Sequence, residues 1–219
     1  MESLPTLHNR DEFTMIQNPK SYWQNVSNHP EWKSYILPRE NDADFDSEGL
    51  VEAQRLFYYF DRNSVVVDYG CGIGRVLKYV AERAGFTIGL DICDGFLGRA
   101  KETIKRDNVA FCNSDEYQDE NVADFVYSLM VLQHNDAPNR EKIVDHILRI
   151  LRPGKTAVVS FPQFGSTYYE ETPFLHKFTK EEVEAYGKAF SSYRIIEGNL
   201  PGYQKAIDGV NEYFLIVVK

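Results

Sequence analysis

The chain of 219 residues has only three cysteines, Cys71, Cys93 and Cys112. No two of them have the two-residue spacing of a redox or zinc motif, and an odd number fits no closed set of disulfides. We therefore expect three free thiols in a reducing compartment, and no metal site is predicted. The first residues also lack a basic start followed by an apolar run, so no signal peptide is expected.

Long apolar runs and clusters of basic residues are missing as well. No stretch of about 20 apolar residues is present that could span a bilayer. Acidic residues outnumber basic ones by 33 to 24, and the formal net charge is −9. Affinity for nucleic acid or anionic lipid depends on clustered Lys and Arg, whereas here these residues are scattered. The sequence therefore predicts a cytoplasmic protein whose partner is neither nucleic acid nor a membrane.

The chain does contain a regular alternation of short apolar runs and helical patterns. Strand-like runs lie at 65–69, 86–91, 109–112, 124–130, 156–161, 193–197 and 212–218. Helical patterns lie at about 47–60, 74–84, 94–106, 138–151 and 179–190. This alternation predicts a doubly wound α/β fold with a mostly parallel sheet covered on both faces. No helix fits easily between the last two strands, so they are expected to pair antiparallel.

Three glycines follow the first strand in the segment VVVDYGCGIGRV. Gly70, Gly72 and Gly74 turn the chain toward a helix that is expected to begin near Arg75. Glycines at such a turn let a ligand approach the backbone, and a helix N-terminus favours an anionic group. By itself the turn is a weak signal, because a tight strand-to-helix connection can have the same glycines.

Acidic residues follow the next two strands at the same edge of the predicted sheet. Asp91 ends the second strand, about 20 residues beyond the glycines, where an acid accepts the hydroxyls of a ribose. Asp115 and Glu116 come just after the third strand, and the fourth ends near Ser128. Because ligands of open α/β sheets bind at the carboxyl ends of the strands, these residues indicate one adenosine-sized cleft.

From about residue 46 to residue 219 the chain resembles the class I methyltransferases that depend on S-adenosylmethionine (SAM). The resemblance rests on VVVDYGCGIGRV, IGLDIC, CNSDEY, DFVYSLMVLQH and LRPGKTAVVSFP, in that order and spacing. It implies a Rossmann-like, seven-stranded, mostly parallel sheet with an antiparallel last strand. Tyr69 departs from the family pattern, which usually has a small or aliphatic residue there.

The resemblance also implies which residues bind the methionine part of SAM. Asp68 and the backbone from Gly70 through Cys71 to Gly72 are expected to hold it. The backbone of Ser128 is expected to lie beside the methionine amino group.

The adenosine part is assigned in the same way. Asp91 is expected to bind the ribose hydroxyls, and Ile92 is expected to pack on the adenine. Asp115 is expected to meet the adenine amino group, with Glu116 nearby.

Nicotinamide dinucleotide is the competing cofactor. The glycines read GxGxG and not GxGxxG, and Asp68 ahead of them would repel a pyrophosphate. The same carboxylate favours the sulfonium and the amino group of SAM. We therefore expect SAM as the cofactor.

Two residues outside the cofactor motifs are candidates for the site. His134 lies just past the fourth strand, where it is either a general base toward the acceptor or a support for the cofactor. Trp23 belongs to an aromatic N-terminal segment that either covers the site or packs on the sheet. We divide the chain into a helical lid segment, 1–44, with short helices and turns, and a methyltransferase domain, 45–219.

The methyl acceptor is less closely defined by the sequence. The Asn/Asp-Pro-Pro-aromatic motif of enzymes that methylate nucleic-acid amino groups is replaced here by SLMVL. A small organic acceptor, methylated on oxygen or nitrogen, is the leading hypothesis. A protein methyltransferase and a SAM-binding protein without catalysis remain as alternatives.

Overall fold

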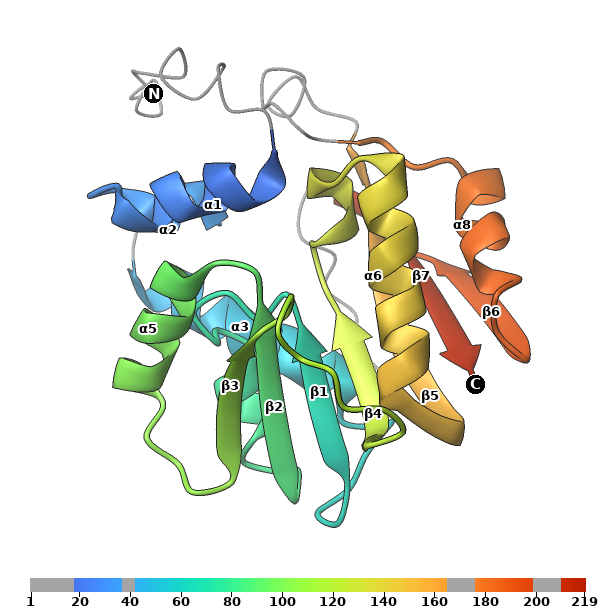
Figure 1. The fold of residues 1–219 in the computed structure, drawn as a ribbon, viewed down its shortest axis with the longest axis horizontal. Coiled ribbons are helices and arrows are strands. Elements are labelled where there is room, and N and C mark those ends of the chain that lie inside the picture. Colours follow the sequence, from blue (N-terminus) through green and yellow to red (C-terminus); the bar gives the residue numbers. More distant parts are fainter. Residues whose placement is uncertain (1–17, 37–41, 165–175, 199–209) are drawn as a thin grey trace.

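A computed structural model describes residues 18–36, 42–164, 176–198 and 210–219. Its centre is a seven-stranded sheet with the strand order β3-β2-β1-β4-β5-β7-β6 (Figure 1). The strands are β1 (Val65–Tyr69), β2 (Phe86–Asp91), β3 (Val109–Asn113), β4 (Ala123–Ser128), β5 (Leu151–Phe164), β6 (Ser192–Glu197) and β7 (Val210–Val218).

The strand directions match the sequence prediction. Strands β1 to β5 pair parallel, and β7 pairs antiparallel with both β5 and β6. The order reverses between β1 and β4, because β2 and β3 lie on one side of β1 and β4 and β5 lie on the other. The predicted doubly wound fold with an antiparallel last strand is confirmed.

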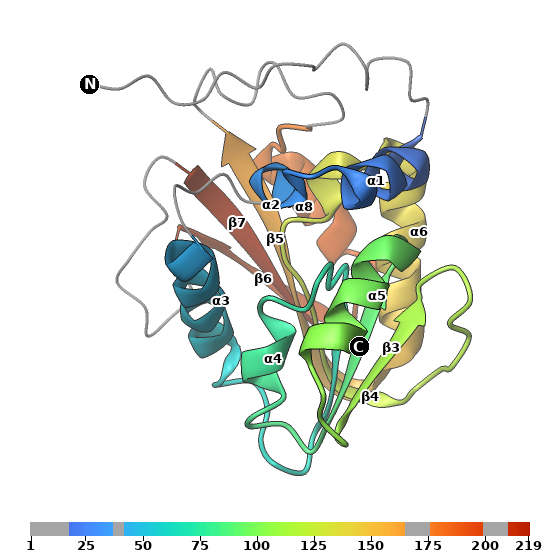
Figure 2. The same cartoon turned by 90° about the vertical axis from the view of Figure 1, so that its left-hand side faces the viewer.

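Helices cover both faces of this sheet (Figure 2). The helices of the described residues are α1 (Pro19–Asn28), α2 (Trp32–Ile36), α3 (Asp42–Leu56), α4 (Leu77–Val80), α5 (Asp94–Thr103), α6 (Ala137–Ile150) and α8 (Lys180–Gly187), with a 3-10 turn η2 (Leu132–His134) before α6. Residues of α3 and α4 share one buried cluster with the sheet, and residues of α6 and α8 share another on the opposite face. None of the helices in the described segments is long and apolar enough to cross a membrane.

The helix ends follow the local sequence closely. The side chain of Asp136 accepts a hydrogen bond from the Asn139 N–H at 3.0 Å and caps α6. Thr179 and Glu182 form the predicted capping box at the start of α8, which satisfies two backbone donors that the helix leaves free.

The prediction of a helix over 74–84 was wrong in its extent, because only Leu77–Val80 is α-helical. Gly72 and Gly74 have φ values of 53° and 77°, so the chain is not yet helical there. Beyond them, the N–H groups of Tyr79 and Arg83 donate to carbonyls three residues back, which makes the turns tighter than an α-helix.

Two strand limits also differ from the prediction. β4 ends at Ser128 and not at residue 130, because Met130 has a φ of 59° and its N–H donates to the Ser160 hydroxyl. β5 begins at Leu151, directly after α6, so the Pro153 and Gly154 pair does not delay the strand. Gly154 has a φ of 75° and its N–H reaches the Lys219 carbonyl at 2.9 Å, which accommodates the irregular pairing there.

The first helix of the core starts earlier than expected. Asp46 lies inside α3 and does not cap it; its carboxylate pairs with Lys78 and accepts a hydrogen bond from the Tyr79 hydroxyl. The predicted boundary at residue 44 therefore falls within α3.

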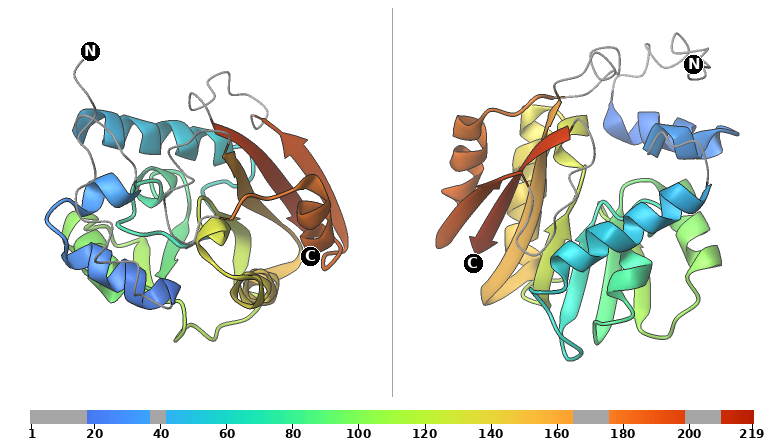
Figure 3. Two further views of the ribbon diagram at one scale, coloured as in Figure 1. Left: turned by 90° about the horizontal axis from the view of Figure 1, so that it is seen from above. Right: turned by 180° about the vertical axis from the view of Figure 1, so that it is seen from behind.

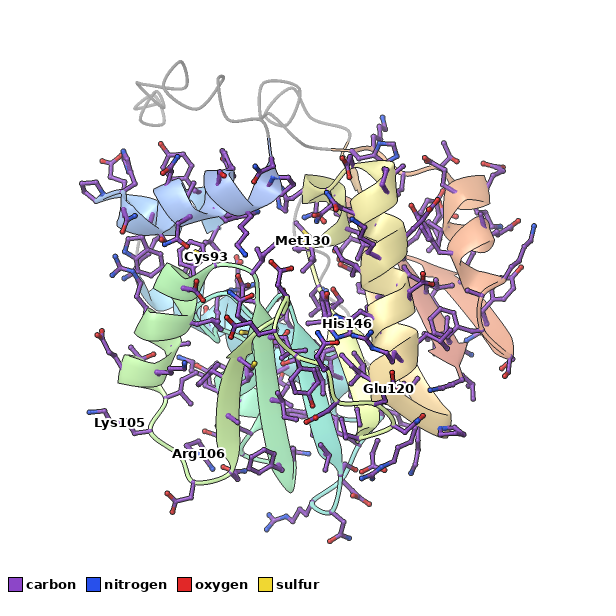
Figure 4. The ribbon with its side chains drawn as sticks, in the orientation of Figure 1. Cys93, Lys105, Arg106, Glu120, Met130 and His146 are labelled. Atoms are coloured by element: carbon purple, nitrogen blue, oxygen red, sulfur yellow. The ribbon has the colours of Figure 1, made fainter. Side chains whose placement is uncertain are left out.

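Helices α1 and α2 lie over the carboxyl ends of the strands (Figures 1 and 3). Tyr22 and Val26 of α1 form a separate buried cluster with Cys93 and Phe96 at the start of α5. Figure 4 shows Cys93 at this junction beneath α1. Helix α1 is thus attached to the sheet through α5.

Candidate functional site

A cavity of about 820 Å³ lies at the carboxyl ends of β1, β2, β3 and β4. This is within the usual size of a site for a small molecule or cofactor. Among the sequence-predicted site residues, those that line it are Trp23, Asp68, Gly70, Cys71, Gly72, Asp91, Ile92, Asp115 and His134. Segments from four strand ends and from α1 therefore meet at one place.

The glycine loop is shaped by two close approaches. The N–H groups of Gly70 and Cys71 both donate to the Leu90 carbonyl of β2, at 2.7 and 2.9 Å. A Cβ on Gly70 would lie 2.2 Å from Val131, whereas a Cβ on Gly72 would enter open space. Both glycines have positive φ, which other residues rarely adopt. The backbone at Gly72 is thus accessible from the cavity.

Asp91 connects this loop to the start of α5. One carboxylate oxygen accepts the Gly72 N–H at 2.7 Å and the other accepts the Cys93 N–H at 2.8 Å. Burial raises the pKa of Asp91 to about 6, and the hydrogen bonds oppose this shift only in part. The two bonds fix the orientation of the carboxylate, which leaves its remaining lone pairs for hydroxyl groups in the cavity.

This arrangement agrees with known proteins. A family model described as a methyltransferase domain matches residues 67–159. The N-methyltransferase NodS of Bradyrhizobium japonicum, solved with S-adenosylhomocysteine (SAH), has the same fold, with a TM-score of 0.66 at 15% identity over 92% of this chain and 98% of that one. Residues 67–159 are a class I methyltransferase domain. The family expected from the motifs is thereby confirmed.

Other relatives of the methyltransferase domain are longer proteins. Phosphoethanolamine N-methyltransferase 1 of Triticum aestivum is 26% identical, over 92% of this chain and 46% of its own length. Sterol 24-C-methyltransferase of Saccharomyces cerevisiae is 30% identical over 55% of this chain and 33% of its own length. Phosphoethanolamine N-methyltransferase 2 of Haemonchus contortus, solved with phosphomonomethylethanolamine and SAH, gives a TM-score of 0.66 at 16% identity over 90% of this chain and 60% of that one. The chain spans less than half the length of these two curated relatives.

In the methyltransferase domain, Asp68 is the most strongly perturbed acid of the cavity wall. Its side chain is only 4% exposed, next to the glycine loop. Burial, and after it the charges of Asp91 and Glu52, raise the pKa of Asp68 to about 8. This carboxyl therefore carries its proton in most molecules at neutral pH.

Asp115 forms a contact that the sequence did not indicate. Its carboxylate pairs with the ammonium of Lys20 on α1 at 2.7 Å, and both side chains are about half exposed. Lys20 also lines the cavity, so the end of β3 and the N-terminal segment meet at its rim. Glu116, the neighbour of Asp115, is exposed and does not line the cavity.

Ser128 also lies outside the cavity lining. It is fully buried, and its hydroxyl donates to the Tyr69 carbonyl at 2.9 Å, so it joins β4 to β1. The next two residues, Leu129 and Met130, line the cavity in its place. The unusual Tyr69 packs its ring edge-on against His146 of α6, on the other face of the sheet from Asp68.

Trp23 of α1 and His134 of η2 contact each other in the cavity wall. Their rings meet edge to face with centroids 4.9 Å apart, and both residues line the cavity. Burial lowers the pKa of His134 to about 4, so the imidazole is neutral at physiological pH. One ring nitrogen lies 3.1 Å from the side-chain nitrogen of Gln133.

Sequence reasoning missed a group of buried charges beneath α3. Arg75 pairs with Glu52 at 2.7 Å, and both line the main cavity. Arg55 and Glu212 lie close by, 3.9 Å apart. The only available signal was the position of Glu52 and Arg55 beside Ala53 and Leu56, which belong to the apolar stripe of α3. No three His, Cys, Asp or Glu side chains of the described segments form a group suited to a metal ion.

Proposed function

We propose that this chain binds SAM in the cavity and transfers its methyl group to an oxygen or nitrogen of a small organic acceptor. The observation that carries this proposal is the joint presence of Asp68, Asp91 and the open backbone at Gly72 in one cavity wall. The relatives support it, since several are methyltransferases named for small acceptors and two structures contain SAH.

The chemistry of the wall suits SAM. A site with carboxyl groups from Asp68, Asp91 and Asp115 favours a cationic ligand with hydroxyl groups and disfavours a pyrophosphate. Asp91 would accept the ribose hydroxyls, Ile92 would pack on the adenine and Asp115 would meet its amino group. Asp68 and the backbone of Gly70, Cys71 and Gly72 would hold the methionine end. When bound, SAM supplies a methyl group activated by its sulfonium.

Three predicted contacts change in detail under this proposal. Asp115 is paired with Lys20, so it would exchange or share that partner when adenine enters. Glu116 would act only through its charge, because it lies outside the lining. The contact assigned to the Ser128 backbone would pass to Leu129, since Ser128 is fully buried.

We infer that His134 supports the site and does not act as a strong base. Its pKa of about 4 makes it a poor proton acceptor at neutral pH. Its edge-to-face contact with Trp23 stabilises the position of α1 beside the cavity. Methyl transfer itself depends mainly on placing the acceptor in line with the methyl group, and a base is required only when the acceptor must lose a proton.

We further infer that the N-terminal segment, 1–44, is a lid that excludes water. Trp23 and Lys20 of α1 line the cavity, and α1 is attached to α5 through Tyr22, Val26 and Cys93. Residues 1–17 and 37–41 of this segment lie outside the described residues. The net charge of −9 supports a partner that is neither nucleic acid nor a membrane, and a cytoplasmic location stays a prediction from sequence.

Two measurements test this function. Calorimetric titration with SAM, SAH and NAD should give binding of the first two and none of NAD. Incubation with SAM that carries an isotope-labelled methyl group, together with mixtures of small acceptors or of proteins, then identifies the product by mass spectrometry. Binding of NAD without SAM would overturn the cofactor, label in proteins alone would favour a protein methyltransferase, and SAM binding without any labelled product would favour a non-catalytic protein.

A further inference from the structure

A line of polar groups crosses the face of the sheet beneath α3. Asp68 of β1, Ser160 of β5 and Glu212 of β7 lie on this face, opposite Glu52 and Arg55 of α3. All five are buried or nearly so, although this face is otherwise packed with Phe, Val and Ile side chains. Burying charged groups is unfavourable unless they are well paired, so their arrangement calls for a functional reason.

A small chamber adjoins the main cavity at this line. Glu52, Leu129 and Met130 line both spaces, and Arg55 and Glu212 complete the chamber. Its volume is about 10 Å³, which is about the space that the centre of one water-sized group requires. Met130, labelled at the upper end of β4 in Figure 4, holds a φ of 59° at the border between the two spaces. Such backbone strain in a non-glycine residue is common at ligand sites.

The two ion pairs beside the chamber differ in distance. Arg75 contacts Glu52 at 2.7 Å, whereas Arg55 is 3.9 Å from Glu212, beyond hydrogen-bond distance. The side chains of Arg55 and Glu212 are only 5% and 11% exposed. The lining of the chamber itself carries two carboxylates, Glu52 and Glu212, and one guanidinium, Arg55. A small cation in the chamber would offset this excess of carboxylate in its wall.

The pKa of Glu212 depends on the same buried groups. Burial raises the pKa of Glu212 to about 7, the charge of Glu52 raises it as well, and Arg55 and the Ser160 hydroxyl lower it. Arg55 and Glu52 come from α3 and Ser160 from β5, and these are the described groups that act on Glu212. Arg194 of β6 lies on the same face but acts on Tyr59.

We propose that the methyl acceptor carries an ammonium group, and that the chamber between Glu52, Arg55 and Glu212 binds it. This inference rests on the proposed function and names the acceptor as a small amine. The ammonium has about the size of the single group that the chamber admits, and the rest of the acceptor would extend past Leu129 and Met130 into the main cavity. Glu212 is then an acceptor-binding residue.

The test compares three probes of equal length, n-propylammonium, 1-propanol and propionate, by NMR titration of the full chain. The titrations are run with and without saturating SAH. Propylammonium should bind at least about tenfold more tightly than the other two. Its affinity should rise about tenfold from pH 6 to pH 8, because the ionised fraction of a group with a pKa of about 7 rises by that factor.

The matched variants are Glu212→Gln and, as a control, Glu197→Gln on the exposed part of β6. Glu212→Gln should abolish both the preference for propylammonium and its pH dependence while SAH affinity stays unchanged. Glu197→Gln should behave as the unaltered chain.

Equal binding of the three probes, tighter binding of propionate, or no binding of propylammonium would overturn the proposal, as would unchanged amine affinity in Glu212→Gln. The probe comparison on the unaltered chain decides the question even if Glu212→Gln does not fold. A chain that binds propylammonium but no SAH would refute the proposed function and leave the chamber as an ammonium site.

Discussion

Replacing Asp68 by Asn separates stability from cofactor binding. The carboxyl group is 4% exposed and its pKa is raised to about 8, above the value of about 3.9 in an unfolded chain. A raised pKa means that the folded state holds the proton to higher pH than the unfolded state does. The folded chain therefore loses stability as the pH rises from about 4 to about 8.

The size of this effect follows from the two pKa values. The carboxyl loses its proton at about pH 3.9 in the unfolded chain and at about pH 8 in the folded chain, so pH 7 lies about three pH units above the unfolded pKa while the folded chain still holds the proton. At about 1.4 kcal/mol per pH unit, the folded state at pH 7 has lost on the order of 4 kcal/mol of stability relative to low pH. Asn has nearly the same shape and does not ionise, so it avoids this penalty. Since 1 kcal/mol shifts the melting temperature of a chain of this length by about 2–4 °C, we expect Asp68→Asn to melt at least about 5 °C higher at pH 7. At pH 4 the difference should vanish.

Cofactor binding should change in the opposite direction. Binding of the cationic SAM favours the ionised carboxylate, so the unaltered chain should release close to one proton on binding at pH 7. Asp68→Asn should release none, and it should bind SAM at least about tenfold more weakly, the loss of one charge-assisted hydrogen bond.

The assays are scanning calorimetry at pH 4 and pH 7, and titration calorimetry of SAM in two buffers of different ionisation enthalpy. Asp91→Asn is the control, because its carboxylate holds two backbone N–H groups and its pKa is raised only to about 6, so no comparable gain in stability is expected. A melting temperature for Asp68→Asn that is equal or lower at pH 7, or unaltered SAM affinity, would refute the reasoning.

Three further results are expected. Asp91→Ala should lower SAM affinity about 10- to 100-fold, measured by titration calorimetry. It should also lower the melting temperature, because the N–H groups of Gly72 and Cys93 lose their acceptor. Unchanged affinity in a folded variant would place the ribose elsewhere. Deletion of residues 1–36 should leave a folded domain by circular dichroism but give poor turnover in the labelled-methyl assay, and full activity would contradict the role of α1 as a lid. His134→Ala should lower SAM affinity and turnover together with no recovery at higher pH, whereas a loss of turnover of about 10²–10⁴-fold with normal SAM affinity would identify a general base.

The sequence by itself determined the sheet and the edge of the sheet at which the cavity lies. Each strand is a short apolar run between glycines, prolines or helical patterns, so its position can be read locally. Once the strands are parallel, their carboxyl ends lie at one edge, and Asp68, Asp91 and Asp115 must come near one another. The glycine spacing likewise located the loop, although not the loss of helix after Gly74, which depends on positive φ values.

Only the tertiary structure decided which distant groups meet and how strongly they are buried. Lys20 and Asp115 are 95 residues apart in the chain, and Trp23 of α1 contacts His134 of η2. Periodicity assigns a residue to a face of its own helix or strand, but it does not give the distance to a residue on another element. The raised pKa values of Asp68 and Glu212 depend on burial and on the charge of Glu52 of α3, a residue far from Glu212 in sequence. A pKa depends on every neighbouring charge and on exclusion of water, and both are set only when the whole chain has packed.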